Sequence, residues 1–574
     1  MKKRILSIFI CVATVLGALG LFTGCSEESD HTESDNKNAT TVTLWMTKGE
    51  GTTDEAAKLV ENAINVITES KLNTHVELHL FDKSEYHDAV LNRVSEIGSL
   101  LQSGEEQAGG DEEDSSAATD EVIVDEETGR SHTKYPEVGK TQMDIILING
   151  VDNYRELLDT ELYVDGDFET GVLTPIEPSV LISQYVNSYL LSTARDASMI
   201  QGGSTGVYAI PNNRDFGTYT YLVLNKSVCD ALGYKPEDLA SHTVEGSAAG
   251  YTTSNEQILK YLRAAHEAYP NMTLVQGTPA KEAVWFTFGD DIPVGRGQFI
   301  KAGNHLSTLL EAPPANAFAT ASLKGYYRIF AQLNSWGQPI NENAEVNLDG
   351  DYALAYVHGN ATSVADVDTD KYYVVVTDAP KKTNENMYSS MYGVTKYSVN
   401  AERAGEVVEL FNTNKKFRNL MYYGIENVHC MVDENGEYVK LNNDWNMDLY
   451  DTGNLYLLER SKSLGDYYYA MSENEWKAGK DLNRDSVEGL LLGFTWAKDS
   501  ALDTTLASLR TKNAAWDTQL KSSTADTVEN LLSNIKDSLD NDSDYMYIVN
   551  PEEGVQSVYN QYRAWYTVMN PGQG

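Results

Sequence analysis

Cysteine is scarce in this sequence, with four residues among 574. That count excludes a disulfide framework, and because Cys11 and Cys25 lie near the N-terminus, only Cys229 and Cys430 remain for the folded body. One disulfide between these two and a pair of buried free thiols are both compatible with the sequence. Histidine is scarce as well, with ten residues, and no clustered histidine–cysteine spacing occurs. We therefore predict neither a metal site nor a cofactor.

Positive charge is also in short supply. Lys and Arg number 44 against 85 Asp and Glu, which gives a formal net charge of −41. A surface of this sign repels phosphate groups and anionic headgroups, so nucleic acid and anionic lipid are excluded as partners of the folded body. The hydrophobic content of 41% is typical of a packed globular protein, and the length predicts two lobes or more.

The N-terminal segment has the layout of an export signal. Met1-Lys-Lys-Arg4 precedes an apolar run at 5–22, and the following Leu21-Phe-Thr-Gly-Cys25 resembles the lipobox at which lipoprotein signal peptidase cuts. We expect residues 1–24 to be removed and Cys25 to carry the lipid, which anchors the protein at the outer face of the cell membrane. Residues 25–41 are polar and acidic, and we expect a disordered tether. A retained membrane helix is the alternative, for which the run is only marginally long enough.

The folded body alternates predicted strands and helices. Periodicity predicts strands at 42–46, 76–80 and 143–148 and helices at 54–70 and 84–101, an order that implies an α/β fold with a mainly parallel sheet covered on both faces. Further strands are predicted at 207–211, 219–226, 352–357 and 372–376, and further helices at 254–268, 323–336, 401–413, 524–539 and 554–569. Residues 103–140 are acidic and of low complexity, so we expect a mobile insert; calcium or partner binding there is supported by composition alone.

Two short patterns resemble catalytic or metal motifs in the wrong context. Gly202-Gly-Ser-Thr-Gly206 matches the Gly-x-Ser-x-Gly of hydrolase elbows, yet a strand is predicted directly after Ser204 where an elbow needs a helix. Asp481, Asn483 and Asp485 make half of a calcium loop, without its glycine and distal glutamate, and we expect a solvated turn. We predict no catalytic residue and a protein that is not an enzyme.

Several segments together resemble the family 1 extracellular solute-binding proteins, the sugar-binding lipoproteins of ABC importers. Behind the lipobox come a strand containing Trp45 and then, in order, Asp144-Ile-Ile-Leu-Ile-Asn-Gly150, Val207-Tyr-Ala-Ile-Pro211 and Tyr221-Leu-Val-Leu-Asn-Lys226. Residues 410–429 resemble a segment of one subset of that family, whose members end in an uncharacterised C-terminal domain. Residues 489–497 and 559–565 resemble landmarks of that domain.

The resemblance implies a two-lobed, periplasmic-binding-protein-like (type II) fold with a cleft between the lobes and an extra helical C-terminal region. We place the N-lobe at 42–172 and 376–425, and the C-lobe at 173–375 and 426–574, the last stretch including the C-terminal extension. Closure of two lobes removes water from a ligand and lets both contribute contacts. The implied function is capture of an oligosaccharide or related sugar and its delivery to ABC permease subunits.

The alternatives to that function differ in class. An importer receptor for a peptide or a charged small molecule shares the fold implied above but differs in cargo. A surface-attached glycoside hydrolase needs only two carboxylates at the right separation, and this acidic sequence offers many. An adhesive lipoprotein would bind no soluble ligand.

Candidate ligand-binding residues follow the predicted strands, because ligands of open α/β sheets bind off the carboxyl ends of strands. A sugar needs both aromatic faces and polar groups there. The candidates are Trp45, Lys48, Asn149 and Asp152 in the N-lobe, Asn213, Arg214, Trp285 and Asn360 in the C-lobe, and Tyr392 in the N-lobe's return segment. Other roles are open for three of them: core packing for Trp45, helix capping for Asp152 and sheet packing for Tyr392.

Overall fold

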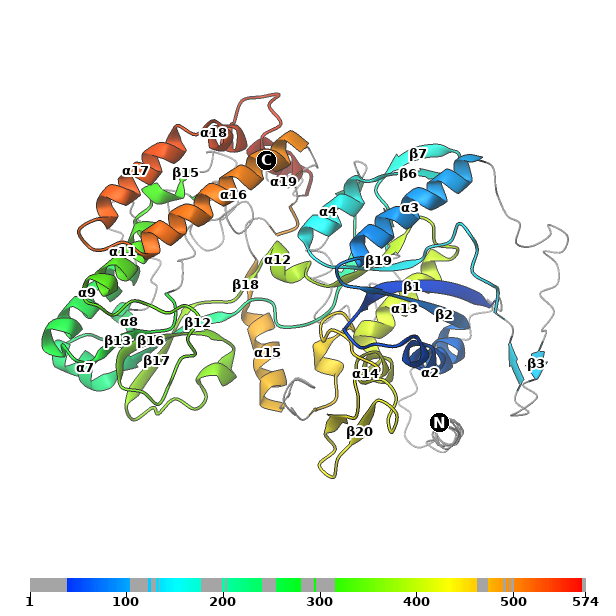
Figure 1. Ribbon diagram of the computed structural model, residues 1–574, viewed down its shortest axis with the longest axis horizontal. Helices are drawn as coiled ribbons and strands as arrows, with labels where there is room; N and C mark the ends of the chain where they lie inside the picture. The colour runs from blue at the N-terminus through cyan, green and yellow to red at the C-terminus, as the bar shows by residue number, and fades with distance from the viewer. Residues whose placement is uncertain are drawn as a thin grey trace. The chain divides into compact units, whose positions relative to one another are not determined.

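The chain forms two compact units in the computed structural model shown in Figure 1. The structure describes residues 39–103, 122–124, 131–133, 135–176, 199–201, 204–239, 254–279, 294–295, 315–461, 473–488, 492–494, 496 and 500–569. The first unit comprises Met1–Arg214 and Tyr388–Ser472, and the second comprises Asp215–Met387 and Glu473–Gly574. Each unit is thus assembled from two separate stretches of chain.

The first unit is built on a six-stranded sheet with the order β11-β19-β5-β1-β2, in which β8 also pairs with β19. β1 (Thr40–Lys48) runs parallel to β2 (Thr74–Asp82) and to β5 (Ile145–Ile148). β19 (Met391–Thr395) runs antiparallel to β5, to β11 (Ala209–Pro211) and to β8 (Leu173–Thr174). The predicted mainly parallel sheet is therefore confirmed, with β19 as its reversed strand.

Helices cover both faces of this sheet. α2 (Asp54–Leu72) connects β1 to β2, and α3 (Tyr86–Ser103) leads back from β2 toward β5. Since right-handed crossovers in opposite directions place their helices on opposite faces, α2 and α3 lie on either side of the sheet (Figure 1). α2 begins where the side chain of Thr53 accepts from the Ala56 amide and ends at Asn73 in the left-handed conformation.

The remaining elements of the first unit follow the returning chain or lie at the sheet's rim. They are α4 (Val151–Asp159), β6 (Glu161–Val164), β7 (Asp167–Thr170), α13 (Ala401–Thr413), α14 (Lys415–Tyr423), β20 (Cys430–Val432), β21 (Tyr438–Lys440) and the short pairs β3 (Val122–Val124) with β4 (Ser131–Thr133) and β9 (Met199–Gln201) with β10 (Ser204–Gly206). Ser204 itself begins β10, and β11 rather than a helix follows it, so the expectation that no elbow forms here is confirmed.

The second unit has a four-stranded sheet with the order β13-β16-β12-β17. These strands are β12 (Tyr219–Asn225), β13 (Thr273–Gln276), β16 (Tyr352–Gly359) and β17 (Tyr372–Asp378). Their apolar side chains share a core with α9 (Ser254–Ala268) and with Ile329 and Leu333 of α11 (Ala321–Ser335). Shorter elements are α7 (Lys226–Leu232), α8 (Pro236–Leu239), β14 (Val294–Gly295), β15 (Ala315–Asn316), β18 (Lys381–Lys382), α12 (Asn384–Met387), α15 (Glu473–Asp485) and β22 (Val487–Glu488).

The C-terminal helices belong to the second unit through the other face of α11. α16 (Ser500–Lys521), α17 (Val528–Asp540), α18 (Ser543–Val549) and α19 (Val558–Met569) form a second core with Tyr326, Tyr327 and Phe330 of α11. The guanidinium of Arg328 binds both carboxylate oxygens of Glu529, at 2.6 and 2.9 Å. α11 therefore carries two apolar faces, and the predicted extra helical region covers one of them.

Most of the predicted strands and helices lie within two residues of observed ones, whereas elements such as α16 were not predicted. α17 and α19 begin four residues later than predicted, at Val528 and Val558. The predicted solvated turn at 481–485 is wrong, because these residues form the last turns of α15. The disulfide alternative is also wrong, since Cys229 and Cys430 are buried free thiols.

The chain passes from one unit to the other after Arg214, Met387 and Ser472, and these positions differ from the predicted boundaries at 172, 375 and 425. The first unit extends to Arg214 because β11 joins its sheet beside β19. It also takes in the chain from 426 to 472, within which the loop at 449–454 is bonded to the ends of β11 and β19 as described below. Sheet pairing over long separations sets these limits, and a local pattern does not encode it.

Two groups of predictions concern residues that the structure does not describe. The signal sequence, Cys25 and the start of the tether lie outside the described residues, as does most of the acidic insert at 103–140. In the part of the chain that is described, no helix combines the length and the apolarity that a membrane span requires.

We predict that Leu532→Ala in α17 lowers the free energy of unfolding by about 2–5 kcal/mol, because it empties a core position in the second unit. Leu532 is 1% exposed within the core that α11 shares with the C-terminal helices. Urea denaturation followed by circular dichroism measures the change. Ser533→Ala, at the exposed neighbouring position, is the matched control, and equal effects of the two variants would contradict the integrated core.

We predict that stability falls as the pH drops from about 6.5 to about 4, in part through His429. His429 is 2% exposed, and its Nδ1 accepts from the Ile425 amide at 3.0 Å. Burial lowers the pKa of its imidazole to about 4, so the unfolded chain takes up a proton over this range while the folded state does not. In denaturation at several pH values, the stability difference between wild type and His429→Gln should narrow toward pH 4. A difference independent of pH would refute this role.

Candidate ligand-binding site

Polar side chains gather at the carboxyl ends of β1 and β5 in the first unit. Thr47 lies near the end of β1 and Asn149 directly follows β5. A loop at 449–454, far away in sequence, brings Asp451 to the same edge. The Asp451 carboxylate accepts from Thr47 Oγ1 at 2.9 Å and from Asn149 Nδ2 at 3.3 Å. In an open α/β sheet, this edge is where ligands bind.

Asp451 is an unusual group at this edge because it is an acid held out of water. Its residue is 3% exposed, and burial raises the pKa of its carboxyl, with a further contribution from the charge of Asp448. Hydrogen bonds from Thr47 and Ser390 act in the opposite direction. Among the described residues, no lysine or arginine forms an ion pair with Asp451. A buried carboxylate without an ion-pair partner is stabilised by hydrogen-bond donors, and a ligand can supply them.

The side-chain amides of Asn149 and Asn212, beside Asp451, have oxygens that accept no hydrogen bond from the described residues. Asn212 donates through Nδ2 to the Tyr450 carbonyl at 3.0 Å and to Ser390 Oγ at 3.1 Å. The Oδ1 atoms of Asn149 and Asn212 are both buried and have no hydrogen-bond partner among the described residues. Buried polar atoms are nearly always paired. These two oxygens and the Asp451 carboxylate make an acceptor-rich edge, complementary to a ligand that carries hydroxyl or amino groups.

Arg214 lies over the same loop. Its guanidinium carbon is 3.7 Å from the ring centroid of Tyr450, a cation–π distance. The contact holds the last residue of the unit's first stretch against a residue next to Asp451. Of the predicted candidates, Asn149 and Arg214 are thus joined through one loop. We expect Lys48, at the end of β1, to lie near the same edge.

Trp45 and Asn213 in the first unit are both buried by contacts within the protein. Trp45 is 8% exposed and stacks on His79 and Phe81, with centroids 4.9 and 5.0 Å apart, so core packing accounts for its position. Asn213 and Arg214 belong to the first unit, not to the second lobe as predicted, because the preceding strand β11 pairs with β19. Asn213 is 4% exposed, and its backbone binds the Asn412 side chain and the Leu455 amide.

Tyr392 is also buried, but it acts on the site indirectly. It is 0% exposed and stacks on Phe411, with a centroid distance of 4.2 Å. Its hydroxyl donates to the Asp451 carbonyl at 2.5 Å. The sheet-packing alternative therefore describes its ring, and its hydroxyl supports the loop that carries the buried acid.

Asp152 is the candidate most open to solvent. It lies in the first turn of α4, with its side chain 66% exposed and 3.9 Å from Arg155. The capping alternative is wrong, because α4 begins at Val151 and Gly150 occupies the cap position. A carboxylate in the first turn still stabilises the helix through its favourable interaction with the helix dipole.

The second unit contributes Asn360, which directly follows β16. Asn360 caps a short 3₁₀ helix (Ala361–Val364) by accepting from the Thr362 amide at 2.9 Å. Its Nδ2 donates to Asp215 at 3.4 Å. Tyr219 and Tyr221 at the start of β12 have ring centroids 5.6 Å apart, so aromatic and polar groups share this edge. Trp285 lies outside the described residues.

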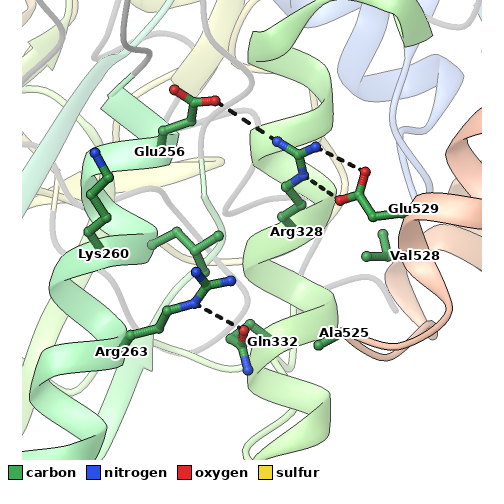
Figure 2. A pocket seen from close by; sticks show the side chains of 9 residues that line it. Glu256, Lys260, Arg263, Arg328, Gln332, Ala525, Val528 and Glu529 are labelled. Atoms are coloured by element: carbon green, nitrogen blue, oxygen red, sulfur yellow. Dashed lines mark hydrogen bonds and ion pairs between the residues drawn. The ribbon is translucent and has the colours of Figure 1, made fainter.

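A pocket elsewhere in the second unit is lined by α9, α11 and the start of α17 (Figure 2). Its charged groups engage one another: Arg328 binds Glu529 and lies 3.9 Å from Glu256, and Arg263 donates to Gln332 at 3.2 Å. The Arg328–Glu529 pair joins α11 to α17, and the other two contacts join α9 to α11. The polar edge of the first unit, with its buried acid and incompletely bonded amides, is the stronger candidate site.

Sequence analysis missed Asp451, Thr47 and Ser390. Asp451 is 302 positions from Asn149 and 404 from Thr47, and no strand precedes it to attract attention. The run Asp448-Leu-Tyr-Asp-Thr-Gly453 carries two acids next to an aromatic residue and a glycine, which is the signal that could have suggested a functional turn.

Comparison with known proteins supports the fold. No family model and no curated sequence matches the chain. Among solved structures it is similar to the N-glycan transport solute-binding protein of Streptococcus pneumoniae, at 13% identity over 93% of this chain and 100% of that one, with a TM-score of 0.54. The extracellular solute-binding protein of Bifidobacterium longum subsp. infantis matches at 12% identity over 92% and 98%, with a TM-score of 0.40. The first of these two likenesses shows that the chain has the two-lobed α/β fold of that protein.

We predict that Asp451→Asn stabilises the folded protein near neutral pH. Because burial raises the folded-state pKa of this carboxyl, the ionised form costs stability above the ordinary aspartate pKa of about 3.9, and the amide avoids that cost. The stability gain should grow as the pH rises from 4 toward 7, measured by urea denaturation. Asp152→Asn, at an exposed acid of the same unit, serves as the control. A loss of stability that is constant with pH would show that the carboxylate is required for folding.

Proposed function

We propose that this protein is the substrate-binding subunit of an ABC importer, which captures an oligosaccharide or related sugar and delivers it to permease subunits. The proposal depends on one observation: a buried carboxylate and two incompletely bonded amide oxygens lie at the carboxyl edge of a sheet in a solute-binding-protein fold. Sugar hydroxyls are donors that such acceptors can bind. The similar protein of Streptococcus pneumoniae is named for N-glycan transport, which favours a sugar as cargo.

Aromatic rings beside polar groups occur in each unit, which supports the same ligand class. In the first unit Tyr450 is adjacent to Asp451 in the loop, and in the second unit Tyr219 lies beside the strand that leads to Asn360. A sugar presents apolar C–H faces together with its hydroxyls, so aromatic rings beside carboxylate and amide groups suit it. Closure of the two units around the ligand remains a prediction from the resemblance.

We further propose that the protein is exported and held by a lipid on Cys25 at the outer face of the membrane. Support comes from the basic start, the apolar run and the lipobox-like sequence. Such an anchor with a polar tether would keep a receptor near its permease while leaving it free to turn.

A glycoside hydrolase is the second candidate, because Asp451 has another carboxylate nearby in Asp448. The Asp448 charge contributes to the raised pKa of Asp451, and hydrolases use paired acids whose pKa values differ. Asp448 is, however, engaged with the Tyr450 amide at 2.9 Å and lies 3.7 Å from Lys83. These contacts favour a structural role for Asp448 and a binding protein over an enzyme.

We predict that the body from Thr40 to Gly574 shows a raised melting temperature with oligosaccharides in a thermal-shift screen. The panel contains mannose, maltose, maltotriose and Man5GlcNAc, with trialanine, trilysine and free amino acids as the contrasting set. A ligand that binds only the folded state stabilises it by mass action, about 2.7 kcal/mol at a hundredfold excess over Kd. Asp451→Asn should reduce the shift, whereas Asp167→Asn, at an exposed acid of β7 outside the candidate site, should leave it intact.

Other results of the screen would select other functions. A shift with the peptides or amino acids alone would keep the importer and reject the sugar. Release of new reducing ends from the oligosaccharides would favour the hydrolase. No shift with any compound would contradict the receptor and favour an adhesive role.

A further inference from the structure

The loop at 449–454 is held from its inner side by a single arginine. Arg418 of α14 donates from Nη2 to the Leu449 carbonyl at 2.8 Å, from Nη1 to Thr452 Oγ1 at 2.7 Å and from Nε to the Asn454 carbonyl at 3.2 Å. These three acceptors flank Asp451 on both sides along the chain. One planar guanidinium therefore fixes both ends of the short segment that carries the buried acid.

Arg418 is an exceptional side chain in this environment. It is 0% exposed, and burial lowers its pKa to about 10, so it stays charged at neutral pH. Its hydrogen-bond acceptors are carbonyl groups and a hydroxyl of one loop, and the ring of Tyr422 lies 5.5 Å away. Burial of a charge costs free energy unless all its hydrogen bonds are made. The Arg418 guanidinium can make all three of its hydrogen bonds only when the loop keeps this one conformation.

The outer side of the same loop is bonded to β19 and β11. Ser390 and Asn212 donate to the Tyr450 carbonyl, both at 3.0 Å, and the Tyr392 hydroxyl donates to the Asp451 carbonyl. Gly453 allows the close approach: its φ is +115°, and a Cβ there would lie 2.3 Å from the Phe411 carbonyl. The loop is thus fixed between α14 and the sheet, with the Asp451 carboxylate directed at Thr47 and Asn149.

We infer that Arg418 is a positioning residue for ligand binding, which holds the 449–454 loop so that Asp451 presents its carboxylate at the carboxyl ends of β1 and β5. The inference rests on the proposed function for the ligand, but the loop's dependence on Arg418 does not. Lysine keeps the charge and has a point donor in place of the planar fork, so it cannot make the three bonds in this geometry.

The first test measures amide hydrogen exchange at 449–454 in the unliganded protein. Arg418→Lys and Thr452→Val, which removes one of the three acceptors, should each speed exchange of these amides by about tenfold or more, since hydrogen bonds to a charged group are stronger than those between neutral groups. Thr68→Val is the matched control, because it removes a buried threonine hydrogen bond, to Asn65 at 3.0 Å, elsewhere in the first unit. It should leave exchange at 449–454 unchanged.

The second test measures affinity by calorimetry with Man5GlcNAc or maltotriose, whichever stabilises the wild type. Arg418→Lys should weaken binding about tenfold or more, and Thr452→Val should weaken it less. Because Arg418 acts through Asp451, either change added to Asp451→Asn should weaken binding little further. A purely structural residue would lower the melting temperature without this non-additivity, as Thr68→Val should.

Unchanged exchange and unchanged affinity in folded Arg418→Lys would overturn the inference. If that variant does not fold, Thr452→Val decides by the same two measurements. Fully additive losses with Asp451→Asn would also overturn it, since Arg418 would then act by another route. If neither sugar binds the wild type, the proposed function fails while the exchange measurement still decides whether Arg418 holds the loop.

Discussion

The pairing of β19 between β5 and β11 is the constraint on which the first unit depends. The chain enters the unit a second time at Tyr388 and lays Met391–Thr395 antiparallel to both neighbours. Each backbone ladder joins stretches that are far apart in sequence. Ser390 and Tyr392, at the start of this strand, then bond the loop that carries Asp451. The pairing of β19 therefore also determines the position of the loop that carries Asp451.

The site shows a balance between stability and binding. Asp451 is buried without an ion-pair partner among the described residues, and the amide oxygens of Asn149 and Asn212 lack hydrogen bonds there. Each of these groups disfavours the folded state. Arg418 adds a second buried charge, bonded to the loop's carbonyls. A rigid loop that keeps acceptors in place before the ligand arrives reduces the ordering cost of binding.

In the second unit, α11 packs against two separate hydrophobic cores. An ordinary amphipathic helix buries one stripe, whereas α11 places Ile329 and Leu333 in the core of the sheet and Tyr327 and Phe330 in the core of the C-terminal helices. The C-terminal region is thereby part of the unit's hydrophobic interior. The ion pair between Arg328 and Glu529 at the rim joins α11 to α17.

Local patterns in the sequence determined the elements and the fold class. Helices such as α9 and α13 were predictable to the residue because apolar spacing and caps are properties of neighbouring positions. The residues after β1 and β5 were predictable as candidates because strand ends are visible in a sequence. Tertiary structure alone decided that Trp45 and Tyr392 are buried, that β19 is reversed, and that Asp451 and Arg418 complete the site. Those outcomes depend on hydrogen bonds and packing between residues up to hundreds of positions apart, which no local pattern records.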